Sequence, residues 1–161
     1  MSVLALREFT AVGSRGLSVT ASFIEGQLDK LSSQMQNSFV FGQMAKGTFD
    51  ELAEVFANCR QPNWDGYDAL PVDIRTFEIA QEFLKKLPLG IRAPSIGAEP
   101  DGHITMEWHR SLRKTLSVSI SPKGELHFAE LFGFDKKFGT KMFIGAVPEE
   151  IVGAIHKVMG K

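Results

Sequence analysis

Glu107, His109 and His127 are the residues from which a metal or acid–base site could be drawn. Glu107 and His109 share one face of a predicted strand with His103 and Thr105, and His127 falls on the same face two strands away. Imidazole and carboxylate groups bind Zn²⁺ or transfer protons in many enzymes. However, same-face neighbours along a strand lie about 6.6 Å apart and two strands span about 9.5 Å, whereas zinc ligands converge within about 2.3 Å of the ion. We therefore expect no catalytic residue, no metal ligand and no cofactor.

A second segment that could do chemistry reads Asn-Trp-Asp-Gly-Tyr-Asp over residues 63–68. It contains the only Tyr of the chain and one of its two Trp residues. In one interpretation it is an Asp-Gly turn in which Trp64 packs under the sheet and Asp65 caps local amides. In the other, Trp64 and Tyr67 anchor a protein partner, because large aromatic side chains supply contact area at low entropic cost. Both stay open, and Trp64, Asp65 and Tyr67 are candidate partner-binding residues.

Basic residues are concentrated in the C-terminal part of the chain. Residues 108–161 hold nine Lys and Arg against five Asp and Glu, whereas residues 1–107 hold nine against fourteen. The net charge of the whole chain is −1, which argues against a globally electrostatic nucleic-acid binder. No aromatic residue is interleaved among the basic residues of the predicted loops to form a stacking platform. The candidate nucleic-acid contacts are Arg110, Arg113, Lys114, Lys136 and Lys137.

The sequence lacks the motifs of the common reaction types. It has no glycine-rich nucleotide loop, nucleophile elbow, paired Cys motif or HExxH helix. Cys59 is the single Cys and cannot form an internal disulfide, which indicates a reducing compartment such as the cytoplasm. Arg7 and Glu8 interrupt the apolar start too early for a signal peptide or a membrane span, so we expect no membrane partner.

An N-terminal helical arm is predicted over residues 1–45. Leu17, Ile24, Leu28 and Leu31 lie on a narrow apolar seam with heptad spacing. The seam could pack on the arm's own domain or dock on another chain, and both alternatives stay open. These four residues are candidate partner-binding residues, including for a homo-oligomer formed through the helix.

The remaining residues, 46–161, are predicted to form an α+β domain. Thr48 and Glu51 form a capping-box pattern that begins one helix, and a second helix is expected from Asp73, a good N-cap, to about Leu87. The final helix begins at Pro148, with acidic residues in its first turn.

Two similar loops indicate an antiparallel β-meander between these helices. Residues 99–103 and 121–125 each place Pro at the first turn position and Gly where a left-handed conformation closes a three-residue hairpin loop. Because side chains alternate between faces, these loops fix the register of a four- to five-stranded sheet. A long loop over residues 132–140 and a fifth strand over residues 142–147 follow. The predicted core rows are Ile96-Met106-Val118-Phe128 and Ala98-Ile104-Ile120-Leu126.

Five segments within residues 62–130 read NWDGY from residue 63, EPDG from 99, EW from 107, LSVSI from 116 and GELHFA from 124. In these segments the chain resembles a family of small uncharacterised bacterial proteins of mobile and phage-related elements. The resemblance implies a mobile-element, phage-defence or counter-defence setting, with a protein partner encoded by a neighbouring gene. The expected function is therefore a non-enzymatic protein-interaction module. The alternatives are a nucleic-acid-binding regulator and, after it, a small metal-dependent hydrolase or nuclease.

Overall fold

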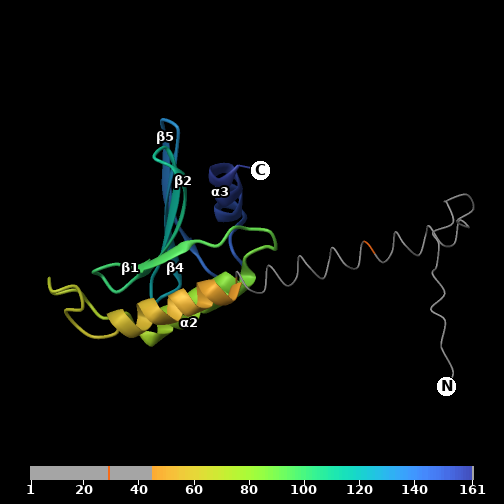
Figure 1. Cartoon of the computed structure of the whole chain (residues 1–161). Coiled ribbons are helices and arrows are strands. Elements are labelled where there is room, and N and C mark those ends of the chain that lie inside the picture. Colours follow the sequence, from red (N-terminus) through yellow and green to blue (C-terminus); the bar gives the residue numbers. More distant parts are fainter. Residues whose placement is uncertain (1–28, 30–44, 161) are drawn as a thin grey trace, which may run out of the picture. The chain divides into compact units, whose positions relative to one another are not determined.

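The computed structural model describes residue 29 and residues 45–160. Residues 45–160 form the predicted α+β domain, a five-stranded antiparallel sheet packed with helices (Figure 1). One helix covers residues 45–59, and the strands follow one another in the spatial order β1-β2-β3-β4-β5. The other elements are α2 (Ile74–Lys86), β1 (Ser95–Ala98), β2 (Ile104–Ser111), β3 (Lys114–Ile120), β4 (Glu125–Phe132), β5 (Asp135–Met142) and α3 (Glu149–Met159). The predicted seam of the arm, Leu17, Ile24, Leu28 and Leu31, lies outside the described residues.

The two glycine-closed hairpin loops have the predicted conformation. Gly102 and Gly124 have φ angles of +84° and +82°. The Ser121 N–H donates to the Glu125 carbonyl at 3.0 Å, and the first loop closes in the same way. The predicted register is confirmed through β4, with the pairs Ile96↔Met106, Ala98↔Ile104, Ile104↔Ile120, Met106↔Val118, Val118↔Phe128 and Ile120↔Leu126.

One face of the sheet forms the core under the helices. Both α2 and α3 pack on β2 and β3, and α3 also contacts β4. Met106 and Trp108 of β2, Phe83 of α2 and Ile155 of α3 are at most 1% exposed. Burial of each such side chain stabilises the fold by about 1.5–3 kcal/mol. The opposite face, here called the outer face, carries Thr105, Ser119 and His127, as the alternation predicts.

The fifth strand differs from the prediction. β4 continues to Phe132, a two-residue turn formed by Gly133 and Phe134 follows, and β5 covers most of the segment that was expected to be a loop. The predicted strand over 142–147 overlaps β5 only at Met142. Every residue of β5 is exposed except the half-buried Gly139, so the strand has no alternating apolar pattern to reveal it.

Helix starts agree with the sequence at two places out of three. The Asp73 carboxylate accepts the Arg75 N–H at 2.7 Å at the start of α2, and Pro148 immediately precedes α3. The first helix is already helical at residue 45, so Thr48 lies inside it and is not its cap. Glu51 instead accepts the N–H of Ile96 in β1 at 3.0 Å. Within the described part of the chain, no helix has the length and apolar character needed to cross a membrane.

Candidate functional site

The aromatic segment folds into a loop that is held by its own polar side chains. Asp65 Oδ1 accepts the N–H groups of Tyr67 and Ala69 at 2.8 and 3.1 Å, and Asn63 Oδ1 accepts the Asp68 N–H at 2.9 Å. Asn63 and Asp68 have φ angles of +59° and +65°, a left-handed conformation that Asn and Asp adopt more readily than other residues with a Cβ. The backbone of the loop is therefore fixed at several points at once.

The two aromatic side chains of this loop have opposite environments. Trp64 is half-buried against the core, and its Nε1–H donates to the Leu70 carbonyl at 3.0 Å. The Tyr67 side chain is 88% exposed, and Leu70 is 58% exposed. The packing interpretation thus describes the surroundings of Trp64 and Asp65, whereas Tyr67 presents its ring to solvent. We call residues 63–70 the recognition loop.

The recognition loop lies directly beside the β1–β2 hairpin. The Leu70 N–H donates to the Pro100 carbonyl at 2.8 Å. A Cβ atom placed on Gly102 would lie 2.8 Å from the Pro71 carbonyl oxygen, closer than real contacts allow. Gly102 is therefore required twice, by its left-handed φ and by this close approach. Two of the sequence segments that carry the family resemblance are thereby joined in space.

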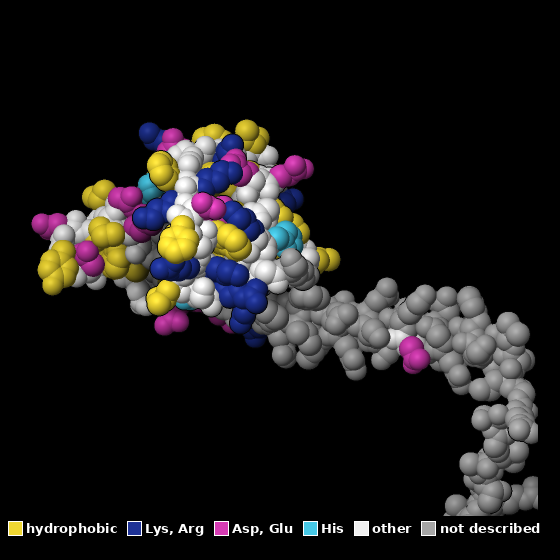
Figure 2. Space-filling view, turned by 90° about the horizontal axis from the view of Figure 1, so that it is seen from above, with side chains coloured by type: hydrophobic (Ala, Val, Ile, Leu, Met, Phe, Trp, Pro, Cys, Tyr) yellow, Lys and Arg dark blue, Asp and Glu magenta, His cyan; other side chains and the backbone are white. Residues whose placement is uncertain are grey.

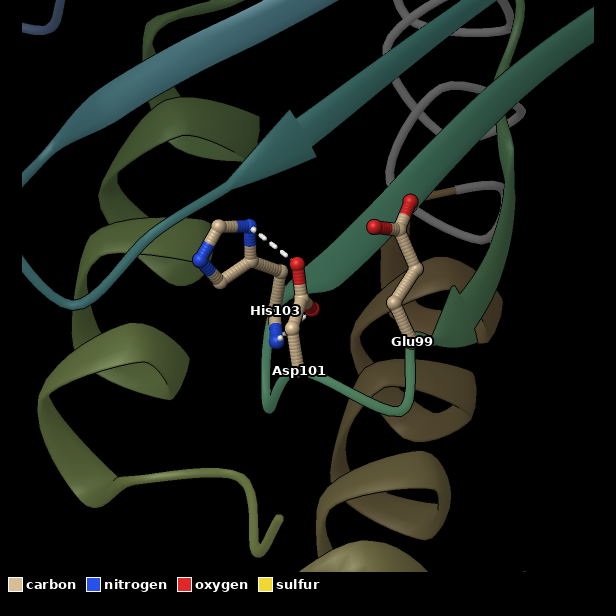
Figure 3. A group of neighbouring side chains, drawn as sticks. All are labelled: Glu99, Asp101 and His103. Carbon is tan, nitrogen blue, oxygen red and sulfur yellow. Dashed lines mark hydrogen bonds and ion pairs between the residues drawn. The ribbon is translucent and has the colours of Figure 1, made fainter. Parts of the chain in front are cut away.

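A cluster of ionisable side chains stands on the same hairpin, as Figure 3 shows. Glu99, Asp101 and His103 each bring one carboxylate oxygen or ring nitrogen within 4.8 Å of the others. Asp101 Oδ2 lies 3.4 Å from His103 Nδ1, and Asp101 Oδ1 accepts the His103 N–H at 3.0 Å. We call these three residues the hairpin cluster. Sequence reasoning missed it, although two acidic residues within four positions of a His at a predicted tight turn were a usable signal.

The hairpin cluster continues onto the outer face through hydrogen bonds. The Glu99 carboxylate accepts from the hydroxyl groups of Thr105 and Ser119. Ser119 Oγ lies 3.2 Å from His103 Nδ1. The rings of His103 and His127 stack with centroids 5.7 Å apart and an interplanar angle of 5°. Glu99, His103, Ser119 and His127 line a hollow of about 380 Å³, together with the small side chains of Ser117 in β3 and Ala129 in β4.

The geometry of the cluster limits the chemistry that it can perform. His103 Nδ1 faces both Ser119 and Asp101, whereas a serine relay needs the nucleophile and the orienting carboxylate at opposite ring nitrogens. Ser119 is only 8% exposed, and its hydroxyl donates to Glu99. A divalent cation has suitable ligand types here, but it would have to compete with these hydrogen bonds for Glu99 and for His103 Nδ1. The arrangement is best described as a fixed polar surface.

The group considered from the sequence, Glu107, His109 and His127, is not brought together. Glu107 Oε1 lies 3.9 Å from His109 Nδ1, which contacts Thr115 Oγ1 at 3.0 Å. His127 Nδ1 instead lies 2.9 Å from the Thr140 Oγ1 atom. Among residues 45–160, only the hairpin cluster places three such side chains close enough to bind one metal ion together.

Two of the predicted nucleic-acid contacts are engaged in the packing of α3. Arg110 Nη1 donates to the Met159 carbonyl at 2.6 Å, at the C-terminal end of the helix. At the other end, the Nζ atoms of Lys137 and Lys141 lie 2.6 and 2.7 Å from the carboxylate of Glu150. Hydrogen bonds from Lys137 and then Lys141 lower the pKa of Glu150 to about 2. These contacts hold both ends of α3 against the sheet.

The other basic candidates gather at the end of the sheet formed by the β2–β3 and β4–β5 turns. The Arg113 guanidinium lies 4.2 Å from the centroid of the Phe134 ring, and Lys114 Nζ lies 5.0 Å from that of Phe132. Lys136 is exposed on β5. Figure 2 shows Lys and Arg side chains gathered around exposed hydrophobic ones on the face seen from above. The fold thus brings aromatic rings to basic side chains that are distant from them in sequence.

Comparison with known proteins leaves the geometry as the basis for assigning a function. No protein family model, no curated protein and no solved structure matches this chain.

Proposed function

We propose that the protein is a cytoplasmic, non-enzymatic protein-interaction module that binds a protein partner through the recognition loop. The observation that carries the proposal is the Tyr67 side chain, which is 88% exposed on a backbone whose N–H groups donate to the side-chain oxygens of Asp65 and Asn63. A rigid loop loses little conformational entropy on binding, and Tyr is among the residues that dominate binding energy at protein interfaces. In line with the family resemblance, the partner would belong to a mobile-element, phage-defence or counter-defence system.

The surroundings of Tyr67 suggest the chemistry of the partner surface. Leu70 adds a second exposed apolar side chain to the same loop. Asp68, next to Tyr67, and Asp101, on the adjoining hairpin, are both exposed carboxylates. A complementary surface would therefore offer an apolar pocket for the phenol ring with Lys or Arg residues at its rim.

The proposal is tested by capture with matched variants. Full-length tagged protein, Tyr67→Ala and Leu89→Ala would be used to capture partners from a bacterial host, with quantitative mass spectrometry as the readout. Leu89 is 92% exposed on the connection between α2 and β1, so its variant controls for the loss of any exposed apolar side chain. We expect one captured protein to be lost with Tyr67→Ala and retained with Leu89→Ala, while both variants melt like the parent. Capture that does not depend on Tyr67 would contradict the proposal.

A nucleic-acid-binding regulator is the second candidate, and the stacking of Arg113 on Phe134 favours it. Exposed aromatic rings with basic neighbours are typical of surfaces that bind single strands by stacking and charge. Fluorescence anisotropy with a labelled single-stranded oligonucleotide should then show binding that weakens steeply with salt. Phe134→Ala should reduce this binding, and Leu89→Ala, which removes an exposed apolar side chain outside the β2–β3 and β4–β5 turns, serves as its control. An affinity that is the same for both variants would remove this candidate.

A further inference from the structure

The two edges of the sheet are protected to different degrees. β1 has four residues, and Glu51 accepts the Ile96 N–H at this edge. β5 has eight residues and pairs with β4 on one side, and no described strand pairs with its other side. Its Phe138 side chain is 83% exposed, and Met142 is 50% exposed. A long strand edge with exposed apolar side chains is a template for pairing with another strand.

The register shows which backbone N–H and C=O groups of β5 can pair with another strand. The Ser121 N–H bonds to the Glu125 carbonyl, so Glu125 directs its backbone groups towards β3. Direction alternates along an antiparallel strand, so residues 126, 128, 130 and 132 face β5. Their partners are the odd-numbered residues of β5, and the bond from the Phe143 N–H to the Gly124 carbonyl fits this pattern. The even-numbered residues, Lys136, Phe138, Thr140 and Met142, therefore direct their N–H and C=O groups away from the sheet.

We propose that β5 pairs antiparallel with β5 of a second copy of this chain, about a two-fold axis through Phe138. The two sheets would then form one continuous sheet across the dimer. Phe138 would lie opposite the partner's Phe138, with both hydrogen bonds of the pair made by groups that are available on β5. On either side of the axis, Lys136 would face the partner's Thr140 and Asp135 the partner's Lys141. The remaining pairs would be Lys137 with the partner's Gly139 and Phe134 with the partner's Met142.

Charge selects this register over its neighbours. An axis at Lys137 would place two identical lysines opposite each other, and an axis at Gly139 would place Lys137 opposite the partner's Lys141. Like charges directly opposite each other destabilise a sheet, whereas opposite charges and aromatic pairs stabilise it. An axis at Thr140 avoids both clashes but pairs fewer residues within the strand and leaves Asp135 beyond its end. With the axis at Phe138, every charged residue of the strand faces an opposite charge or a neutral residue.

Neither α2 nor α3 covers β5, where the second copy would pair. α2 packs over β2 and β3, and α3 packs over β2, β3 and β4. Lys137 and Lys141 point towards α3, where Glu150 binds both. Each copy therefore brings a carboxylate that offsets the charge of the lysines near the new strand junction.

The first test is the mass of the full chain in sedimentation velocity over a concentration series. We expect the mass to rise from 17.8 kDa towards twice that value, and Phe138→Lys to hold it at 17.8 kDa. At concentrations where the parent is monomeric, the two proteins should melt alike. Leu89→Lys places the same charge on another exposed apolar site and should dimerise like the parent. A parent chain that stays monomeric up to about 500 µM would overturn the proposal, since edge pairing would then be weaker than about 4 kcal/mol.

A second test fixes the register. With the axis at Phe138, the Cα atoms of Phe138→Cys lie about 5.5 Å apart in the dimer, within disulfide range. Those of Thr140→Cys lie about 14 Å apart. Mild oxidation should therefore link the first variant and not the second, and the buried Cys59 should not compete. A dimer that survives Phe138→Lys, that is lost instead with Leu28→Glu in the predicted arm, or that links through Thr140→Cys alone would overturn this assignment.

Discussion

Replacing Gly102 or Gly124 by Ala should separate backbone strain from the docking of the recognition loop. Both glycines close hairpin loops with nearly the same φ, +84° and +82°. Their surroundings differ, because a Cβ on Gly124 meets nothing closer than the Phe143 carbonyl oxygen at 3.9 Å. A Cβ on Gly102 lies 2.8 Å from the Pro71 carbonyl oxygen, and a backbone atom cannot swing aside as a side chain could. Both substitutions therefore strain the backbone of a left-handed residue, and only Gly102→Ala adds a steric clash.

The magnitudes follow from these two terms. A left-handed Ala costs about 1–2 kcal/mol, which is the whole effect expected for Gly124→Ala. Gly102→Ala must also push the loop away, which breaks the bond from the Leu70 N–H to the Pro100 carbonyl and adds about 0.5–1.5 kcal/mol or more. We therefore expect the free energy of unfolding to fall by about 1–2 kcal/mol for Gly124→Ala and about 2–4 kcal/mol for Gly102→Ala. At about 4 °C per kcal/mol, the melting temperatures should differ measurably.

Urea unfolding gives the two free energies, and hydrogen exchange of the Leu70 amide reports the docking itself. The Leu70 amide should exchange faster in Gly102→Ala and at the parental rate in Gly124→Ala. Equal losses of stability in the two variants, together with an unchanged Leu70 amide, would refute the reasoning that the loop rests on this hairpin.

Three further outcomes are expected. The pKa of Glu150 is lowered from 4.5 to about 2. The stability that its ionised form contributes is therefore complete above pH 4.5 and is lost as the pH falls towards 2. Thermal melts should show this loss in the parent and not in Glu150→Gln. Burial raises the pKa of the Cys59 thiol, so a thiol reagent should label it slowly in the native protein and rapidly in urea, and equal rates would contradict its burial. Glu130 is 6% exposed, and Lys157 Nζ lies 2.6 Å from its carboxylate. Lys157→Met should therefore lower the free energy of unfolding by about 1–3 kcal/mol. Adding Glu130→Gln to this variant should recover part of the loss.

The sheet could be predicted as far as local signals reached. The Pro and Gly residues of the two hairpin loops determine turn geometry, and with it the register of Ile104 and Ile120, because one slipped residue would expose the apolar row. β5 carries no such signal. It lies at the edge of the sheet, where β4 is its one described neighbour, and its side chains are exposed on both faces. An apolar alternation reports burial, and a strand without burial leaves no alternation to read.

The candidate site could be predicted only in part. Tyr67 stands out by its type and by the Asp-Gly turn before it. The exposure of Tyr67 could not be predicted, because it depends on whether Trp64 or Tyr67 packs against the core. The hairpin cluster depends on the side-chain hydrogen bonds that draw Glu99 towards Ser119 across two strands. The contact of Arg113 with Phe134 arises because two turns distant in sequence meet at one end of the sheet.

Partner binding through the recognition loop is tested most directly by the dissociation constant of a purified captured partner. Isothermal titration calorimetry would compare the parent with Tyr67→Ala and with Leu89→Ala. Loss of a central aromatic anchor costs about 2 kcal/mol or more, so the dissociation constant should rise at least about 30-fold for Tyr67→Ala. It should stay within about twofold of the parent for Leu89→Ala, since an exposed residue outside the interface contributes little. Equal dissociation constants for all three proteins would contradict the assignment of the recognition loop as the binding surface.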